Sequence, residues 1–117
     1  MKILVIDDNV NLSTMFSRLM DTEGHECIVS NDGRNGLTLI EQKKFDAVLL
    51  DLDMPGFTGF DVIDALEKKG DLKKYKIVVL TALDLSLEKM EDLKKRGVHA
   101  CLKKPAKIDL LCEVLKT

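Results

Sequence analysis

The fold of this chain is decided by Ala47-Val48-Leu49-Leu50-Asp51-Leu52-Asp53-Met54-Pro55-Gly56. Four apolar residues in a row predict a strand that is buried on both faces, as in the middle of a parallel sheet. The run ends in Asp51, and ligands of open α/β sheets bind just past the carboxyl ends of the strands. The Pro-Gly pair predicts a turn that leads the chain away from this strand end. Asp51 is therefore a candidate for chemistry at one edge of a sheet.

Strands and helices are predicted to alternate on both sides of this stretch. Runs of apolar residues predict further strands at residues 2–6, 25–29, 76–80 and 99–102. Apolar residues at three- and four-residue spacing predict helices at 9–22, 58–70, 83–96 and 107–116. A further helix is predicted to begin at a cap, either Asn31 or Asp32, and to end just before Lys43. The chain is therefore expected to be an α/β protein, with a doubly wound five-stranded parallel sheet and five helices. The most apolar strands should be central, which predicts the strand order 2-1-3-4-5 with right-handed crossovers.

Length and composition limit the possible classes of protein. With 117 residues, of which 45% are hydrophobic and 32% charged, residues 1–117 are expected to form a single domain. The formal net charge of -2 argues against nucleic acid as a main partner. No apolar run is long enough to span a membrane, and no signal peptide is recognisable, so a cytoplasmic location is expected.

The cysteines and histidines do not predict a disulfide framework or a zinc site. Cys27, Cys101 and Cys112 are odd in number and lack close spacing, which is typical of buried, reduced thiols. His25 and His99 do not supply the closely spaced ligand pairs that zinc requires.

Polar residues follow four of the predicted strands. Because the carboxyl ends of parallel strands lie at one edge of a sheet, Asp7, Asp8, Asp51, Thr81 and Lys104 are expected to converge there. Three neighbouring carboxylates repel one another, and a hard cation such as Mg²⁺ would relieve this repulsion. A carboxylate nucleophile, a metal ion, an ammonium group and a hydroxyl group are together suited to in-line phosphoryl transfer.

The order of these motifs resembles that of the receiver domains of two-component response regulators, in particular the single-domain chemotaxis type with its flavodoxin-like fold. The resemblance spans the whole chain. It is carried by four motifs at successive strand ends: Val5-Ile6-Asp7-Asp8-Asn9, Asp51-Leu52-Asp53-Met54-Pro55-Gly56 with Gly59, Leu80-Thr81-Ala82, and Lys104-Pro105.

The resemblance implies that Asp51 is the phosphoacceptor. It also implies that Mg²⁺ is bound by Asp8, by Asp51 and by the main-chain carbonyl of Asp53, with Asp7 acting through water. Thr81 would then hydrogen-bond to the phosphoryl group.

The same resemblance implies that Lys104 forms an ion pair with the phosphoryl group. Lys103 is the competing assignment, but the lysine of the family directly precedes the proline, which here is Pro105. A cis peptide bond between Lys104 and Pro105 would aim the lysine at the site.

As a receiver domain, the chain would take a phosphoryl group from a sensor histidine kinase or a histidine phosphotransfer protein. It would catalyse only its own phosphorylation and dephosphorylation, and would not otherwise be an enzyme. With no DNA-binding domain attached, its output is expected to pass to a downstream protein target or along a phosphorelay, without direct contact to nucleic acid or membrane.

Four positions depart from the pattern of the family. Cys101 stands where Tyr or Phe usually reports phosphorylation, and Ala106 stands where Phe is common, so a different output mechanism is expected. Asp53 and Leu83 flank the site, and neither is an amide that could orient an attacking water. Slow loss of the phosphoryl group is therefore expected.

Two other functions are compatible with parts of the sequence. The pattern Asp51-x-Asp53 resembles the first motif of haloacid-dehalogenase-type phosphatases, although Pro55 departs from that motif and the chain leaves little room for a cap. The other possibility is a receiver-like module that binds its partner independently of phosphorylation. Turnover of a small phosphate ester would favour the first, and a partner complex insensitive to phosphorylation would favour the second.

Overall fold

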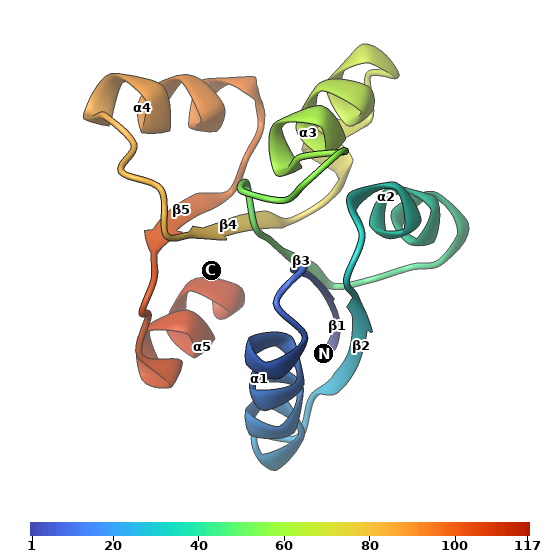
Figure 1. Cartoon of the computed structure of the whole chain (residues 1–117), viewed down its shortest axis with the longest axis vertical. Coiled ribbons are helices and arrows are strands. Elements are labelled where there is room, and N and C mark those ends of the chain that lie inside the picture. The colour runs from blue at the N-terminus through green and yellow to red at the C-terminus, as the bar shows by residue number, and fades with distance from the viewer.

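The structure, a computed structural model, describes residues 1–117 and contains five strands that form one parallel sheet (Figure 1). The strand order is β2-β1-β3-β4-β5, as predicted. The strands are β1 (Lys2–Ile6), β2 (Glu26–Ser30), β3 (Ala47–Leu50), β4 (Ile77–Thr81) and β5 (Ala100–Lys103). The helices are α1 (Val10–Thr22), α2 (Gly33–Gln42), α3 (Gly59–Lys68), α4 (Leu87–Arg96) and α5 (Ile108–Lys116), and a short 3₁₀ helix, η1, spans Leu72–Lys74.

The helices cover both faces of the sheet, with α1 and α5 on one face and α2, α3 and α4 on the other (Figure 1). Successive side chains of a strand point to opposite faces, and the core is accordingly divided into two hydrophobic clusters. In β1, for example, Leu4 and Ile6 pack on the side of α2 and α3, whereas Ile3 and Val5 pack on the side of α1 and α5.

The central and edge strands differ in burial as their sequences predict. Every residue of β3 and β4 is buried, because both strands have neighbours on each side and helices on both faces. The edge strands β2 and β5 are mostly half-buried. The central position of β3 brings its carboxyl end, and therefore Asp51, to the middle of one edge of the sheet.

Polar side chains cap four of the five helices at their N-termini. The side chains of Asn9, Asp32, Thr58 and Ser86 each accept a hydrogen bond from a backbone N–H group in the first turn that follows. At α3, Thr58 and Asp61 form a reciprocal capping box, which fixes the helix start just beyond the turn that follows β3.

The structure corrects several expectations about individual elements. The fourth helix begins at Leu87, not at residue 83, and the residues before it form a loop ending at the cap Ser86. The 3₁₀ helix η1 was not predicted, and β2, β4 and β5 each begin and end one residue later than expected. On α1, Met15 and Leu19 match the three- and four-residue spacing of the apolar residues, but they are 49% and 37% exposed and do not belong to the core.

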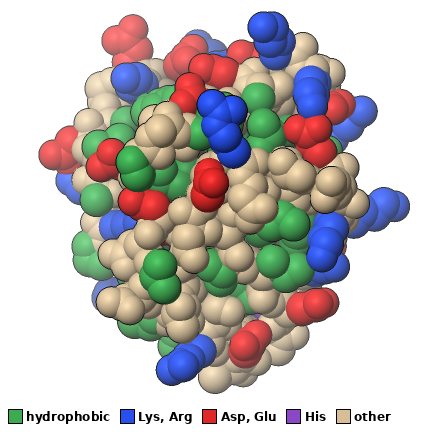
Figure 2. All heavy atoms as spheres, turned by 45° about the vertical axis from the view of Figure 1, so that its right-hand side comes forward, with side chains coloured by type: hydrophobic (Ala, Val, Ile, Leu, Met, Phe, Trp, Pro, Cys, Tyr) green, Lys and Arg blue, Asp and Glu red, His purple; other side chains and the backbone are tan.

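The surface carries acidic and basic side chains interspersed with apolar ones, without a large area of a single charge on the face shown in Figure 2. This distribution agrees with the formal net charge of -2. The three cysteines are free and half-buried. None of the helices is both long enough and apolar enough to cross a membrane.

Candidate functional site

Asp51 directly follows β3 and is only 6% exposed. Its backbone N–H donates to the carbonyl of Ile6 in β1 at 3.0 Å, so the sheet ladder fixes its position. Its side-chain Oδ1 accepts a hydrogen bond from the N–H of Asp53 at 3.2 Å. Gly59 packs against the backbone of Asp51 so closely that a Cβ atom at position 59 would lie 2.2 Å from the carbonyl oxygen of Asp51. The first turn of α3 therefore packs directly against the backbone of the candidate phosphoacceptor.

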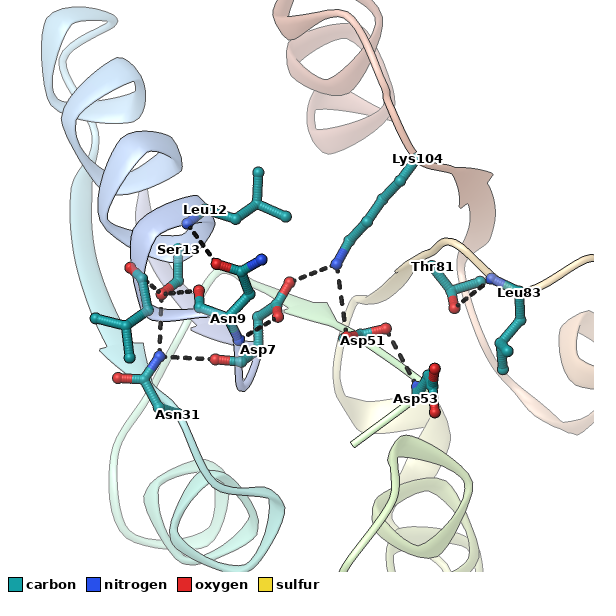
Figure 3. A network of polar contacts seen from close by, with 11 residues as sticks. Asp7, Asn9, Leu12, Ser13, Asn31, Asp51, Asp53, Thr81, Leu83 and Lys104 are labelled. Carbon is teal, nitrogen blue, oxygen red and sulfur yellow. Dashed lines mark hydrogen bonds and ion pairs between the residues drawn. The ribbon is translucent and has the colours of Figure 1, made fainter. Parts of the chain in front are cut away.

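Asp7 follows β1 and is 4% exposed. Its Oδ1 accepts a hydrogen bond from the N–H of Asn9 at 2.9 Å (Figure 3). Its main-chain carbonyl accepts a hydrogen bond from Nδ2 of Asn31 at 2.7 Å, and the same amide group donates to Oγ of Ser13 at 3.0 Å. Side chains from α1 and from the loop before α2 thus hold the backbone of Asp7 in place.

The role of Asn31 in this network was not recognised from the sequence, which gave Asn31 and Asp32 as alternative caps of the next helix. The structure resolves these alternatives, because Asp32 is the cap and Asn31 donates to Asp7 and Ser13. The only signal was an amide side chain just after a strand, and that is too common to indicate a contact with residue 7.

Lys104 is the lysine that reaches the carboxylates. Its Nζ lies 2.6 Å from Oδ2 of Asp7 and 3.5 Å from Oδ2 of Asp51 (Figure 3). Lys103 instead pairs on the surface with Asp84. Consecutive residues at the end of a strand point in opposite directions, which explains why only one of the two lysines enters the site. The peptide bond between Lys104 and Pro105 is cis, as expected from the sequence.

The carboxylates of Asp7, Asp8 and Asp51 each offer a ligand atom, and these atoms all lie within 4.8 Å of one another. The ammonium group of Lys104 balances one of the three negative charges. The remaining negative charge is one that a divalent cation would neutralise. Asp8 is exposed, so an ion held by these oxygens would remain open to solvent on one side. Oxygen ligands with space for retained water are suited to Mg²⁺.

The electrostatics of Asp51 reflect this crowding. Burial raises the pKa of the Asp51 carboxyl group above its ordinary value, and the negative charge of Asp7 raises it further. The N–H of Asp53 and the ammonium group of Lys104 oppose the increase in pKa. Ionisation of Asp51 is therefore less favourable than ionisation of a carboxyl group in water.

Thr81, at the end of β4, lies on the other side of Asp51 from Asp7 (Figure 3). It is 2% exposed, and its Oγ1 accepts a hydrogen bond from the N–H of Leu83 at 3.2 Å. The side chain of Asp53 is exposed, whereas its backbone contacts Asp51. The structure thus brings the sequence-predicted residues to one edge of the sheet: Asp7, Asp8, Asp51, Asp53, Thr81 and Lys104.

Comparison with known proteins gives one family. The response regulator receiver domain matches residues 3–116. The chain is 27% identical to protein PilH of Pseudomonas aeruginosa over 114 residues, which cover 97% of this chain and 93% of PilH. It is 30% identical to the sensor histidine kinase RcsC of Salmonella typhimurium, and this match covers 98% of the chain but only 12% of RcsC.

Solved structures agree with this result. The receiver domain of Francisella response regulator 1452 superposes with a TM-score of 0.88 at 29% identity, covering 98% of this chain and 93% of that one. The chemotaxis protein CheY4 of Vibrio cholerae superposes with a TM-score of 0.85 at 30% identity, covering 98% of this chain and 95% of CheY4. The response regulator TrrA of Thermotoga maritima, in complex with Mg²⁺-BeF, superposes with a TM-score of 0.82 at 30% identity, covering 98% of this chain and 96% of TrrA. The fold, the order of the strand-end residues and these matches together show that the chain belongs to the response regulator receiver domains of two-component signalling.

Proposed function

We propose that residues 1–117 act as a single phospho-accepting receiver domain in which Asp51 takes a phosphoryl group from a phosphohistidine donor. The observation that carries this proposal is the cluster of three carboxylates within 4.8 Å of one another, with the ammonium group of Lys104 between Asp7 and Asp51. Buried carboxylates whose charge is only partly neutralised are costly, and such sites are commonly functional.

In the proposed reaction, a carboxylate oxygen of Asp51 attacks the phosphorus atom of the donor. The new P–O bond forms as the P–N bond to the donor imidazole breaks, and the electron pair of that bond leaves with the imidazole. Lys104 moves from Asp7 to the phosphoryl oxygens, and the hydroxyl of Thr81 donates a hydrogen bond to one of them. The chain modifies only itself, so it is not an enzyme in the usual sense.

The site fits Mg²⁺, because its donors are oxygen atoms and the negative charge that Lys104 leaves uncompensated is one that a divalent cation would neutralise. Asp8, Asp51 and the main-chain carbonyl of Asp53 would hold the ion, and Asp7 would act through water. When bound, the ion supplies positive charge that offsets the negative charge of the phosphoryl oxygens. The cofactor of the reaction is thus proposed to be Mg²⁺.

The proposed partners are a sensor histidine kinase or a histidine phosphotransfer protein as donor, and a downstream protein as target. The likeness to a segment of RcsC, which is a sensor histidine kinase by name, supports this type of donor. The mixed surface charge supports a protein rather than nucleic acid as the target. We place the domain in the cytoplasm, where such donors present their phosphohistidine.

The experiment that tests this function is intact-mass analysis after incubation with acetyl phosphate, with and without Mg²⁺. The wild type is expected to gain one phosphoryl group only when Mg²⁺ is present, and Asp51→Asn is expected to gain none. Asp84→Asn is the matched control, because this carboxylate is exposed, pairs with Lys103 on the surface and is not assigned to the site. It should accept the group as the wild type does.

A wild type that gains no mass would refute the proposal and lead to the phosphorylation-independent binding module. Equal labelling of wild type and Asp51→Asn would show that another residue is the acceptor.

A further inference from the structure

The carboxylate of Asp8 is the least directly held of the three in the cluster. It is exposed, and its oxygens take part in no hydrogen bond or ion pair within the chain. Asp7 and Asp51, by contrast, are buried, and both lie near the ammonium group of Lys104. A carboxylate oxygen of Asp8 nevertheless lies within 4.8 Å of oxygens of both. Because no side-chain partner places Asp8, the direction of its backbone must do so.

The peptide group that joins Asp7 to Asp8 is held by the segment that follows β2. The N–H of Asp7 donates to the carbonyl of Ser30, the last residue of β2, at 3.0 Å. The carbonyl oxygen of Asp7 accepts a hydrogen bond from Nδ2 of Asn31 at 2.7 Å (Figure 3). The side-chain amide of Asn31 thus continues the bonding between β1 and β2 for one step beyond the strand ends. Since a peptide group is planar, a bond to its carbonyl oxygen also restrains the direction in which the chain enters Asp8.

The amide group of Asn31 is itself anchored. Its Nδ2 also donates to Oγ of Ser13 at 3.0 Å, and Ser13 is fully buried on α1. The hydroxyl of Ser13 donates to the carbonyl of Asn9 at 2.9 Å. The N–H of Asn9 in turn donates to Oδ1 of Asp7 at 2.9 Å. Asp8 is therefore flanked on both sides by residues of one connected hydrogen-bond network, in which Asn31 joins the end of β2 to α1.

We propose that Asn31 is a positioning residue of the metal site, which orients the peptide group between Asp7 and Asp8 so that the exposed carboxylate of Asp8 faces the cation. The inference rests on the proposed Mg²⁺-dependent function. Asn31 does not contact the ion, and it acts only through the backbone. Groups that orient the ligands of a metal typically contribute about 10- to 100-fold to its affinity. Asn31 should therefore set how tightly the site holds Mg²⁺.

The choice of cation gives a readout that a merely structural role of Asn31 would not move. Mg²⁺ requires nearly octahedral ligands at about 2.0–2.1 Å, whereas Ca²⁺ accepts about six to eight oxygens at about 2.3–2.6 Å in flexible arrangements. A less strictly oriented Asp8 should therefore weaken the binding of Mg²⁺ more than the binding of Ca²⁺. A general loss of stability would leave the ratio of the two affinities unchanged, because both are measured on the folded protein.

The test is calorimetric titration of the wild type and of Asn31→Ala with Mg²⁺ and, separately, with Ca²⁺. Asn31→Ala should raise the Kd for Mg²⁺ about ten-fold and the Kd for Ca²⁺ by less than about three-fold. Asn35→Ala is the matched control. Asn35 is also exposed, and its Nδ2 donates to Oγ of Ser30 at 2.9 Å, but it makes no bond to Asp7. This variant should bind both ions as the wild type does.

Ser13→Ala tests the same network from the side of α1. It keeps the bond from Asn31 to Asp7 but removes the oxygen that anchors the amide group. The Kd for Mg²⁺ should therefore rise by less than in Asn31→Ala, about three-fold. Urea denaturation in EDTA establishes that each variant is folded before it is titrated.

Unchanged affinity for Mg²⁺ in Asn31→Ala would overturn the inference. Equal losses for Mg²⁺ and Ca²⁺ would also overturn it, as would a loss of the same size in Asn35→Ala. A wild type that does not bind Mg²⁺ would instead overturn the metal site of the proposed function itself. The two failures are distinguishable, because the first is seen only against a wild type that binds the ion.

Discussion

Lys104 donates to Asp7 at 2.6 Å, although 97 positions separate the two residues in the chain. Its distance to Asp51 is longer, at 3.5 Å. In this state the ammonium group therefore mainly neutralises Asp7, and a phosphoryl group on Asp51 would compete for it.

The first prediction concerns Lys104→Met. Removal of the ammonium group leaves Asp7 and Asp51 buried without a cation, so the free energy of unfolding should fall by about 1–3 kcal/mol in EDTA. Mg²⁺ should bind about ten-fold more tightly, because the ion no longer competes with a fixed positive charge. Urea denaturation and a magnesium titration measure the two effects. Lys103→Met is the control, and it should change neither, since Lys103 pairs with an exposed carboxylate.

The second prediction concerns pH and Asp51. Burial, together with the charge of Asp7, raises the pKa of this carboxyl group above its ordinary value of 3.8. The folded protein then keeps the proton to higher pH than the unfolded chain does, so the contribution of Asp51 to stability falls as pH rises through this interval. In EDTA at neutral pH, Asp51→Asn should be more stable than the wild type and should bind Mg²⁺ more weakly.

The stability gained by Asp51→Asn should disappear at acidic pH, where Asp51 is protonated in both folded and unfolded states. Thermal unfolding across the pH range measures this, with Asp53→Asn as the exposed control. A gain that is the same at every pH would contradict the electrostatic explanation.

The third prediction concerns the lifetime of the phosphoryl group. Asp53 and Leu83 flank Asp51 and offer no amide to orient an attacking water, so the phosphorylated protein should lose its label slowly. Asp53→Asn supplies such a group and should accelerate the loss about three- to ten-fold. Decay of the radiolabelled protein gives the rate, and Asp84→Asn serves as control on the neighbouring loop. Equal rates for wild type and Asp53→Asn would show that residue 53 does not control access of water.

The fourth prediction separates two reasons for glycine near the site. A Cβ at Gly59 would come within 2.2 Å of the Asp51 carbonyl oxygen, so Gly59→Ala should cost about 1–3 kcal/mol of unfolding free energy and weaken Mg²⁺ binding. Gly56 has open space around it but a φ of 75°. Gly56→Ala should therefore cost about 1 kcal/mol through backbone strain alone and leave Mg²⁺ binding intact. Denaturation with a parallel magnesium titration tests both variants.

The sequence was sufficient to predict the sheet and the edge at which the polar residues meet. Periodicity identified every strand, and the contrast between fully apolar runs, such as Ala47–Leu50, and mixed ones gave the strand order. Convergence of Asp7, Asp51 and Lys104 followed from parallel topology alone, because all carboxyl ends of such a sheet share one edge.

Details that depend on competing local interactions could not be predicted. Leu83, Leu87 and Met90 have helical spacing, but Leu83 is held to Thr81 and the helix begins only after the cap Ser86. Met15 also fits the apolar period of its helix, yet it is 49% exposed, because periodicity gives the angular position of a residue but not the width of the surface its helix buries. The preference of Lys104 for Asp7 over Asp51 depends on distances that only the folded chain defines.

The contact between Lys104 and Asp7 also has a consequence for protein synthesis. At about 5–20 residues per second, the ribosome adds residue 104 about 5 to 20 seconds after residue 7. Until that lysine has emerged and β5 has joined β4, the three carboxylates lack their cation, and the acceptor site is incomplete. Under the proposed function, a nascent or truncated chain that lacks Lys104 would therefore not accept the phosphoryl group, and only completed chains would be phosphorylated.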